Sequence, residues 1–188
     1  MVTDPDHRTR HPTTLPGRIE RMRDRLADLS KGLSLGQRLQ GGLSQALLSA
    51  GAAVLAYLPT QALGLKEGFW AAITAMAVVQ TELVATRNSG RDQLAGAAIG
   101  GVVGVAVTLA GGQHLLGYLL AVILSVLACW LVNIASASRL AGITATIILL
   151  VPHTGTPQHM LLSRVGEVAW GALVALCLVW LRTRLGRR

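Results

Sequence analysis

The sequence lacks the short motifs on which most enzymes depend, and it is poor in acidic residues. It contains no GxSxG, HExxH, Walker or CxxC pattern, and only nine of its 188 residues are Asp or Glu. Its two cysteines, Cys129 and Cys177, lie inside apolar stretches, where we expect them to pack as small hydrophobic residues. No disulfide, metal site, cofactor or enzymatic activity is therefore expected.

Aromatic residues are also scarce, at 4% of the chain, and their scarcity affects how the positive net charge is interpreted. A net charge of +8 would ordinarily suggest a nucleic-acid partner. However, no basic stretch is interleaved with aromatic side chains. The Lys and Arg residues lie between apolar stretches and at the chain ends, where they can face anionic lipid head groups. We therefore expect membrane lipids, and no nucleic acid, among the partners.

Apolar residues are abundant, at 52% of the chain, and they gather in six stretches. These are Leu39–Leu58, Phe69–Ala85, Leu94–Ala110, Leu115–Val132, Leu140–Val151 and Val165–Leu181. A helix that crosses the hydrocarbon core needs about 20 residues, so six crossings would use most of the chain. Several stretches are apolar nearly all round, which indicates contact with lipid or complete burial. The predicted fold class is all-α, a polytopic membrane protein with six transmembrane helices.

The positions of Lys and Arg predict the orientation of these helices. If the amino terminus is cytoplasmic, fifteen of the seventeen Lys and Arg residues lie on the cytoplasmic side. Only Lys66 and Arg164 then lie on the other side. Because short loops rich in Lys and Arg stay in the cytoplasm, both termini are predicted to be cytoplasmic.

The remaining parts of the chain are short and basic. Residues 1–17 carry three prolines and no apolar period, which predicts a disordered tail. In residues 18–36 apolar side chains recur three and four positions apart, which predicts an amphipathic helix. This helix either lies at the cytoplasmic interface or forms a short coiled coil between protomers. The membrane domain is predicted to span residues 37–182, followed by a basic cytoplasmic tail at residues 183–188.

Ionisable residues inside apolar stretches are costly in hydrocarbon and commonly mark function or a fixed partner. Arg164 and Glu167 are three residues apart and share one helical face. They either neutralise each other as an ion pair, or Arg164 attracts an anionic substrate while Glu167 titrates. Glu82 follows the polar Gln80 in the second stretch. It either reaches the cytoplasmic interface or couples transport to protons.

The order of several motifs resembles a known family. The second stretch begins Gly68-Phe69-Trp70 and is followed by Thr86-Arg87, and the third carries Gly96, Gly100 and Gly104. The last stretch begins Arg164-Val165-Gly166-Glu167 and has Gly171 seven residues after the arginine. This pattern resembles the fusaric acid resistance family, which belongs with the aromatic acid exporters and the plant aluminium-activated malate channels. The resemblance covers about residues 38–182.

The resemblance implies a multi-pass protein of the bacterial inner membrane that exports small organic anions, aromatic carboxylates above all. The residues themselves suggest that Glu82 or Glu167 would couple this transport to protons. Arg91 would replace an arginine that the family carries where this chain has Gln93. Larger members have a second six-span set, so this chain is expected to form a homo-oligomer, a dimer or higher. The residues expected to meet the substrate are Arg164, Glu167, Glu82, Gln80, Arg91 and Trp70.

Two alternative functions remain open from the sequence. A passive anion channel of the malate-channel type would need no titrating carboxylate. A membrane adaptor without transport activity would instead use the basic amino-terminal helix to bind a partner or anionic lipid.

Overall fold

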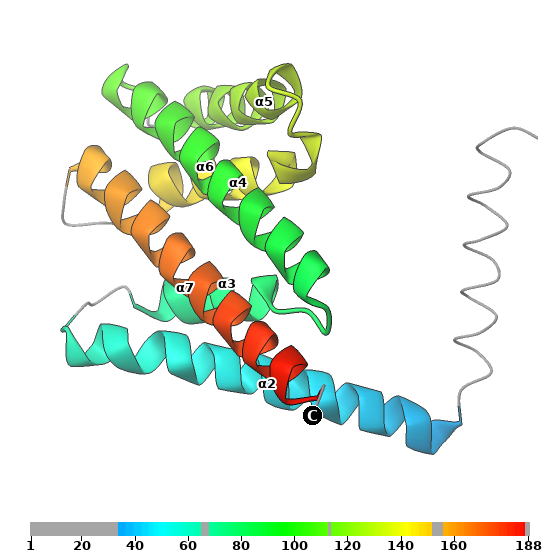
Figure 1. The fold of residues 1–188 in the computed structure, drawn as a ribbon. Coiled ribbons are helices and arrows are strands. Elements are labelled where there is room, and N and C mark those ends of the chain that lie inside the picture. The colour runs from blue at the N-terminus through cyan, green and yellow to red at the C-terminus, as the bar shows by residue number, and fades with distance from the viewer. Residues whose placement is uncertain (1–33, 65–67, 113, 152–155, 187–188) are drawn as a thin grey trace, which may run out of the picture. The chain divides into compact units, whose positions relative to one another are not determined.

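The computed structural model describes residues 34–64, 68–112, 114–151 and 156–186, and all secondary structure within these ranges is helical. The elements are α2 (Leu35–Ala62), α3 (Phe69–Val78), α4 (Leu83–Leu109), α5 (Leu115–Leu131), the 3-10 helix η1 (Ala135–Ala137), α6 (Ser138–Leu150) and α7 (Pro157–Leu185) (Figure 1). The all-α class is confirmed. The predicted amino-terminal tail and nearly all of the predicted amphipathic helix lie outside the described residues.

The chain divides into two compact units, Met1–Leu43 and Ser44–Arg188. The second unit contains α3 to α7 and the larger part of α2. Three helices, α2, α4 and α7, are long and apolar enough to cross a membrane, while α3, α5 and the η1–α6 segment are shorter apolar helices. Each of the six predicted stretches therefore overlaps one main helix, although several helices extend beyond the predicted bounds.

The second predicted span is wrong in its extent. A single helix was expected over Phe69–Ala85, but α3 ends at Val78 and the next residue is extended, with φ −65° and ψ 123°. The polar residues that follow form a break, and α4 begins at Leu83. Because of this break, Arg87 and Arg91 lie in the first turns of α4 and not in a connecting turn.

The glycines of α4 form a close contact with α6 inside one chain. A Cβ added at Gly96 would lie 2.6 Å from the Cβ of Leu140, and one added at Gly104 would lie 3.2 Å from the Cβ of Ile148. Between them, Gly100 meets the α6 backbone. Small residues allow two helix backbones to approach this closely. Because the contacts advance in the same order along both helices, α4 and α6 run parallel.

Helix α7 packs on the other side of α4 and runs antiparallel to it (Figure 1). A Cβ on Gly90, near the start of α4, would lie 3.5 Å from the Cβ of Ala172. Gly101, further along α4, instead meets the side chain of Leu161, nearer the start of α7. The helix α4 thus lies between α6 and α7.

Helix α5 completes the packing against α6, again in the antiparallel sense. Tyr118 and Thr146 approach with their hydroxyl oxygens 3.5 Å apart, and Val122 lies near Gly142. The later residue of α5 therefore meets the earlier residue of α6. Together with the directions above, this shows that α4, α5, α6 and α7 alternate in direction along the chain.

The outer faces of these helices remain apolar. On α5, for example, Leu116 is 74% exposed and Leu131 is 86% exposed. A protein surrounded by water rarely leaves whole helix faces of large apolar residues open. Exposing such faces to the hydrocarbon of a membrane carries no such cost, because lipid tails are as apolar as leucine side chains. The exposed faces therefore support a membrane environment.

Candidate functional site

Arg164 and Glu167 lie on one buried face of α7, with 8% and 7% of their surfaces exposed. The sequence had placed Arg164 ahead of the last span, but α7 begins at Pro157, so Arg164 lies in the second turn of the helix. The hydroxyl of Thr156 caps this early start by accepting the backbone N–H of His159 at 3.3 Å. Proline suits the first helical position because its missing N–H is not needed there. The Thr-Pro pair is thus a sequence signal from which the true start could have been predicted.

The two buried side chains have defined neighbours. The guanidinium carbon of Arg164 lies 4.2 Å from the ring centroid of Trp70, a cation–π contact. The ring of Phe69 lies 4.9 Å from that of Trp70. On the next turn of α7, the Ser163 hydroxyl donates to Oε1 of Glu167 at 3.2 Å. The structure therefore brings together three predicted site residues, Trp70, Arg164 and Glu167, while the predicted ion pair between the last two stays a prediction.

Close packing of α3 on α7 holds Trp70 in this position. A Cβ on Gly171 would lie 3.0 Å from the backbone nitrogen of Ala75 and 2.9 Å from the Cβ of Thr74. A larger residue at this point would push the two helices apart. Near the starts of both helices, Trp70 of α3 contacts Arg164 of α7, and further along both, Ala75 contacts Gly171. The two helices therefore run parallel, as the alternation of directions requires.

A groove of about 570 Å³ lies beside the buried pair, between the end of α2 and the first half of α7. Its polar wall consists of Thr60, His159, Ser163 and Glu167, and the rest is apolar: Pro59, Leu63, Leu162, Gly166 and Trp170. The Trp170 indole N–H donates to the carbonyl oxygen of Ala56 at 3.1 Å and so ties α2 to α7 here. Mostly apolar clefts with a few placed polar groups are typical sites for small organic ligands.

The other three predicted site residues lie elsewhere. Gln80, Glu82 and Arg91 are exposed, the first two in the break between α3 and α4 and the third on α4. The Gln45 side chain of α2 donates to the Val79 carbonyl at 3.3 Å, which places the break beside the early part of the packed α2. The groove instead contacts the end of that helix. The structure therefore does not bring these three residues to the groove.

Sequence reasoning missed the part that Thr86 plays in this break. Thr86 is fully buried, and its hydroxyl oxygen lies 3.1 Å from the backbone nitrogen of Gln80 and 2.8 Å from the carbonyl oxygen of Glu82. It can therefore accept the N–H of one and donate to the carbonyl of the other. Two polar backbone groups outside a regular helix are satisfied this way, which matters where water is scarce. The threonine was noticed as part of a motif, but spacing alone did not indicate its partners.

Apolar helices of alternating direction, together with a buried ionisable pair beside a groove, define a multi-pass membrane protein. The sequence model of a family described as fusaric acid resistance protein-like matches residues 52–178, from α2 into α7, and the chain belongs to this family. The resemblance seen in the motifs is thus confirmed. The family is one of transporter-like efflux proteins and not of enzymes. No curated protein and no solved structure matches the chain.

Proposed function

We propose that this protein exports small organic anions, with aromatic carboxylates as the main substrate class, across a bacterial inner membrane. Family membership supports transport in general. The observation that carries the substrate class is the buried Arg164 guanidinium held on the Trp70 ring, three residues from Glu167, which lines a groove of about 570 Å³. A cation and aromatic rings beside an apolar cleft suit a ligand that combines a carboxylate with a flat ring.

In this proposal the chain crosses the membrane six times with both ends in the cytoplasm. The alternating directions of α4 to α7 support an even zigzag, although α3 and α6 are short. Arg87 and Arg91 lie in the first turns of α4, Arg139 lies in the first turn of α6 and Arg182 lies in the last turn of α7, so these arginines share one end of an alternating bundle. The positive-inside bias makes that end cytoplasmic. The groove then faces the outer side, and Arg91 favours anions at the inner mouth.

Glu167 is the better candidate for proton coupling. It is buried and lines the groove, whereas Glu82 is exposed at the opposite end. A carboxylate inside the membrane that can gain and lose a proton is the usual element of a proton relay. Homo-oligomers would supply further helices around the same route.

Export of radiolabelled benzoate from cells or vesicles tests this proposal. We expect Arg164→Gln to lower the export rate about tenfold or more, since contacts with a charged partner contribute about 1.5–3 kcal/mol. Arg164→Lys should retain part of it. Arg139→Gln, an exposed arginine at the other end of the bundle, serves as the control. Amounts of inserted protein are measured for each variant.

Glu167→Gln separates the exporter from a passive anion channel. An exporter coupled to protons should lose its response to the pH gradient in this variant while still binding benzoate. Anion current that follows the anion equilibrium potential, with or without a pH gradient, would favour the channel. If Arg164→Gln and Glu167→Gln both export benzoate like the unmodified protein at equal amounts, these residues have no part in transport.

A further inference from the structure

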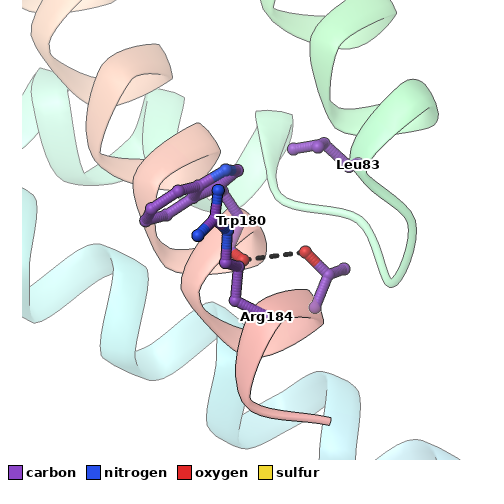
Figure 2. Close-up of a pocket in the computed structure, with 4 residues that line it drawn as sticks. Leu83, Trp180 and Arg184 are labelled. Atoms are coloured by element: carbon purple, nitrogen blue, oxygen red, sulfur yellow. Dashed lines mark hydrogen bonds between the residues drawn. The ribbon is translucent and has the colours of Figure 1, made fainter. Parts of the chain in front are cut away.

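A second pocket, far along α7 from the groove, combines an aromatic ring with a cation. Its volume is about 430 Å³, and it is lined by Leu83, Trp180, Thr183 and Arg184. The guanidinium carbon of Arg184 lies 4.8 Å from the centroid of the Trp180 ring, and Leu83 of α4 stands across from both (Figure 2). This pocket belongs to the end of the bundle that carries Arg87 and Arg91 of α4 and Arg182 of α7.

The polar groups of the pocket are suited to an anion. Arg184 is exposed, and a guanidinium held over a ring keeps N–H groups at its edge for an oxyanion. The Thr183 hydroxyl donates to the Trp180 carbonyl at 2.8 Å, so the threonine shapes the wall without offering a second proton. Arg182, two residues before Arg184, does not line the pocket, and its guanidinium instead donates to the Ser44 hydroxyl of α2 at 3.0 Å.

The pocket continues into an exposed apolar column on α7. Leu173, Cys177, Trp180 and Arg184 follow one another at spacings of four, three and four residues, which places them on one helix face. Leu173 is 53% exposed and Trp180 is 47% exposed. Along about 16 Å of helix, the column is therefore apolar for two turns, then aromatic, then cationic.

We propose that this pocket is a binding site for the head group of an anionic phospholipid. The acyl chain would lie along Leu173 and Cys177, and the phosphate would meet Arg184 beside the Trp180 ring. Tryptophan is enriched at the level of lipid head groups, and basic pockets between helices on the cytoplasmic side bind anionic head groups. Glu82 precedes Leu83 in the chain, and its negative charge would repel a phosphate. The phosphate would therefore bind on the α7 side of the pocket, at Arg184.

This inference rests on the chain lying in a membrane and not on the substrate that it carries. Free phosphate or a small carboxylate has the same charge but no acyl chain, and so could not use the apolar column. The lipid source is favoured because the column and the pocket are continuous. A site of this kind would fix the cytoplasmic end of α7, the helix that also carries Arg164 and Glu167.

Native mass spectrometry of the purified protein with added phosphatidylglycerol or phosphatidylcholine tests the site. We expect more bound phosphatidylglycerol than phosphatidylcholine. Arg184→Gln should weaken the binding of phosphatidylglycerol about fivefold, the effect of one basic residue at a lipid surface. Trp180→Leu should weaken it as well. Arg139→Gln, which removes an exposed arginine from α6 at the same end, should leave it unchanged.

A second measurement begins from the unmodified protein. Brominated phosphatidylglycerol in phosphatidylcholine vesicles should quench the tryptophan fluorescence of the unmodified protein more than brominated phosphatidylcholine does, and Trp180→Phe should remove this difference. Equal quenching by both lipids, or equal loss in Arg184→Gln and Arg139→Gln, would overturn the proposal. Displacement of the bound lipid by millimolar phosphate or benzoate would also overturn it, because the pocket would then hold a soluble anion.

Discussion

At the scale of single residues, the buried polar side chains in the described part of the chain include two kinds. Some satisfy the backbone, as Thr86 does at the break between α3 and α4. Others are ionisable and buried with particular neighbours, as Arg164 is against Trp70. Both kinds are costly to leave without partners inside a membrane. The position of a polar residue in the sequence does not show to which kind it belongs.

Thr86→Val should destabilise the fold more than Thr108→Val. Both hydroxyls donate to the carbonyl four residues earlier, at 2.8 Å from Thr86 to Glu82 and 2.9 Å from Thr108 to Gly104. Only Thr86 also accepts the backbone N–H of Gln80, at 3.1 Å in a part-buried hydrogen bond, and the valine would remove this acceptor. Leaving such a group unsatisfied costs about 1–3 kcal/mol. The midpoint of thermal unfolding in detergent measures the difference, and equal midpoints for the two variants would contradict this role.

At the scale of helices, glycine decides which elements can touch. The glycines of α4 let α6 approach its backbone, and Gly171 of α7 does the same for α3. These two contacts pair α4 with α6 and α7 with α3. The second contact also places Trp70 of α3 against Arg164 of α7. The apolar composition predicts that these segments are helices, but the positions of the glycines determine which helices pack closely against each other.

Gly100→Ala should separate α4 from α6 and lower stability. The added methyl group would collide with the Ala141 backbone, which cannot move aside as a flexible side chain can. Overpacking of this kind typically costs about 1–3 kcal/mol. Gly166→Ala is the matched control, because a Cβ there meets nothing within 4 Å. In that variant the gain in helix propensity, about 1 kcal/mol, should leave stability equal or higher.

Denaturant titration of both glycine variants in the same detergent checks the difference. If Gly100→Ala unfolds at the same denaturant concentration as the unmodified protein, the close approach of α4 and α6 is not needed for stability.

At the scale of the whole molecule, the alternation of helix directions is the feature that a membrane protein requires. Contacts give opposite directions to α4 and α7 and to α5 and α6. Successive connecting loops then lie at opposite ends of the bundle. In a membrane, the loops at one end would face one compartment and the loops at the other end would face the other.

Cysteine labelling of intact cells tests the proposed topology. In a background with Cys129 and Cys177 replaced by alanine, His114→Cys and His159→Cys should react with a membrane-impermeant maleimide. Arg87→Cys and Arg139→Cys should react only after the cells are opened. Labelling of Arg87→Cys in intact cells would refute both the orientation and the assignment of Arg91 to the inner mouth.

Much of the fold could be predicted because apolar composition acts locally. The starts of α3, at Phe69, and of α5, at Leu115, coincide with predicted starts. The break after Val78 could not be predicted from composition, because it involves hydrogen bonds between Gln80 and Thr86, six residues later. The last helix begins at Pro157, eight residues before the predicted start, because the Thr156 cap and not the charge of Arg164 sets its first turn.

The sequence by itself determined the helical class, the apolar segments, the family and the presence of two ionisable residues on one face of the last helix. Each of these follows from composition or from spacing along one helix. Only the tertiary structure decided that Arg164 meets Trp70, that a groove lies beside Glu167, and that Gln80, Glu82 and Arg91 lie at another end. Such relations depend on which helices pack together, and packing is decided by the fit of distant surfaces that no single segment contains.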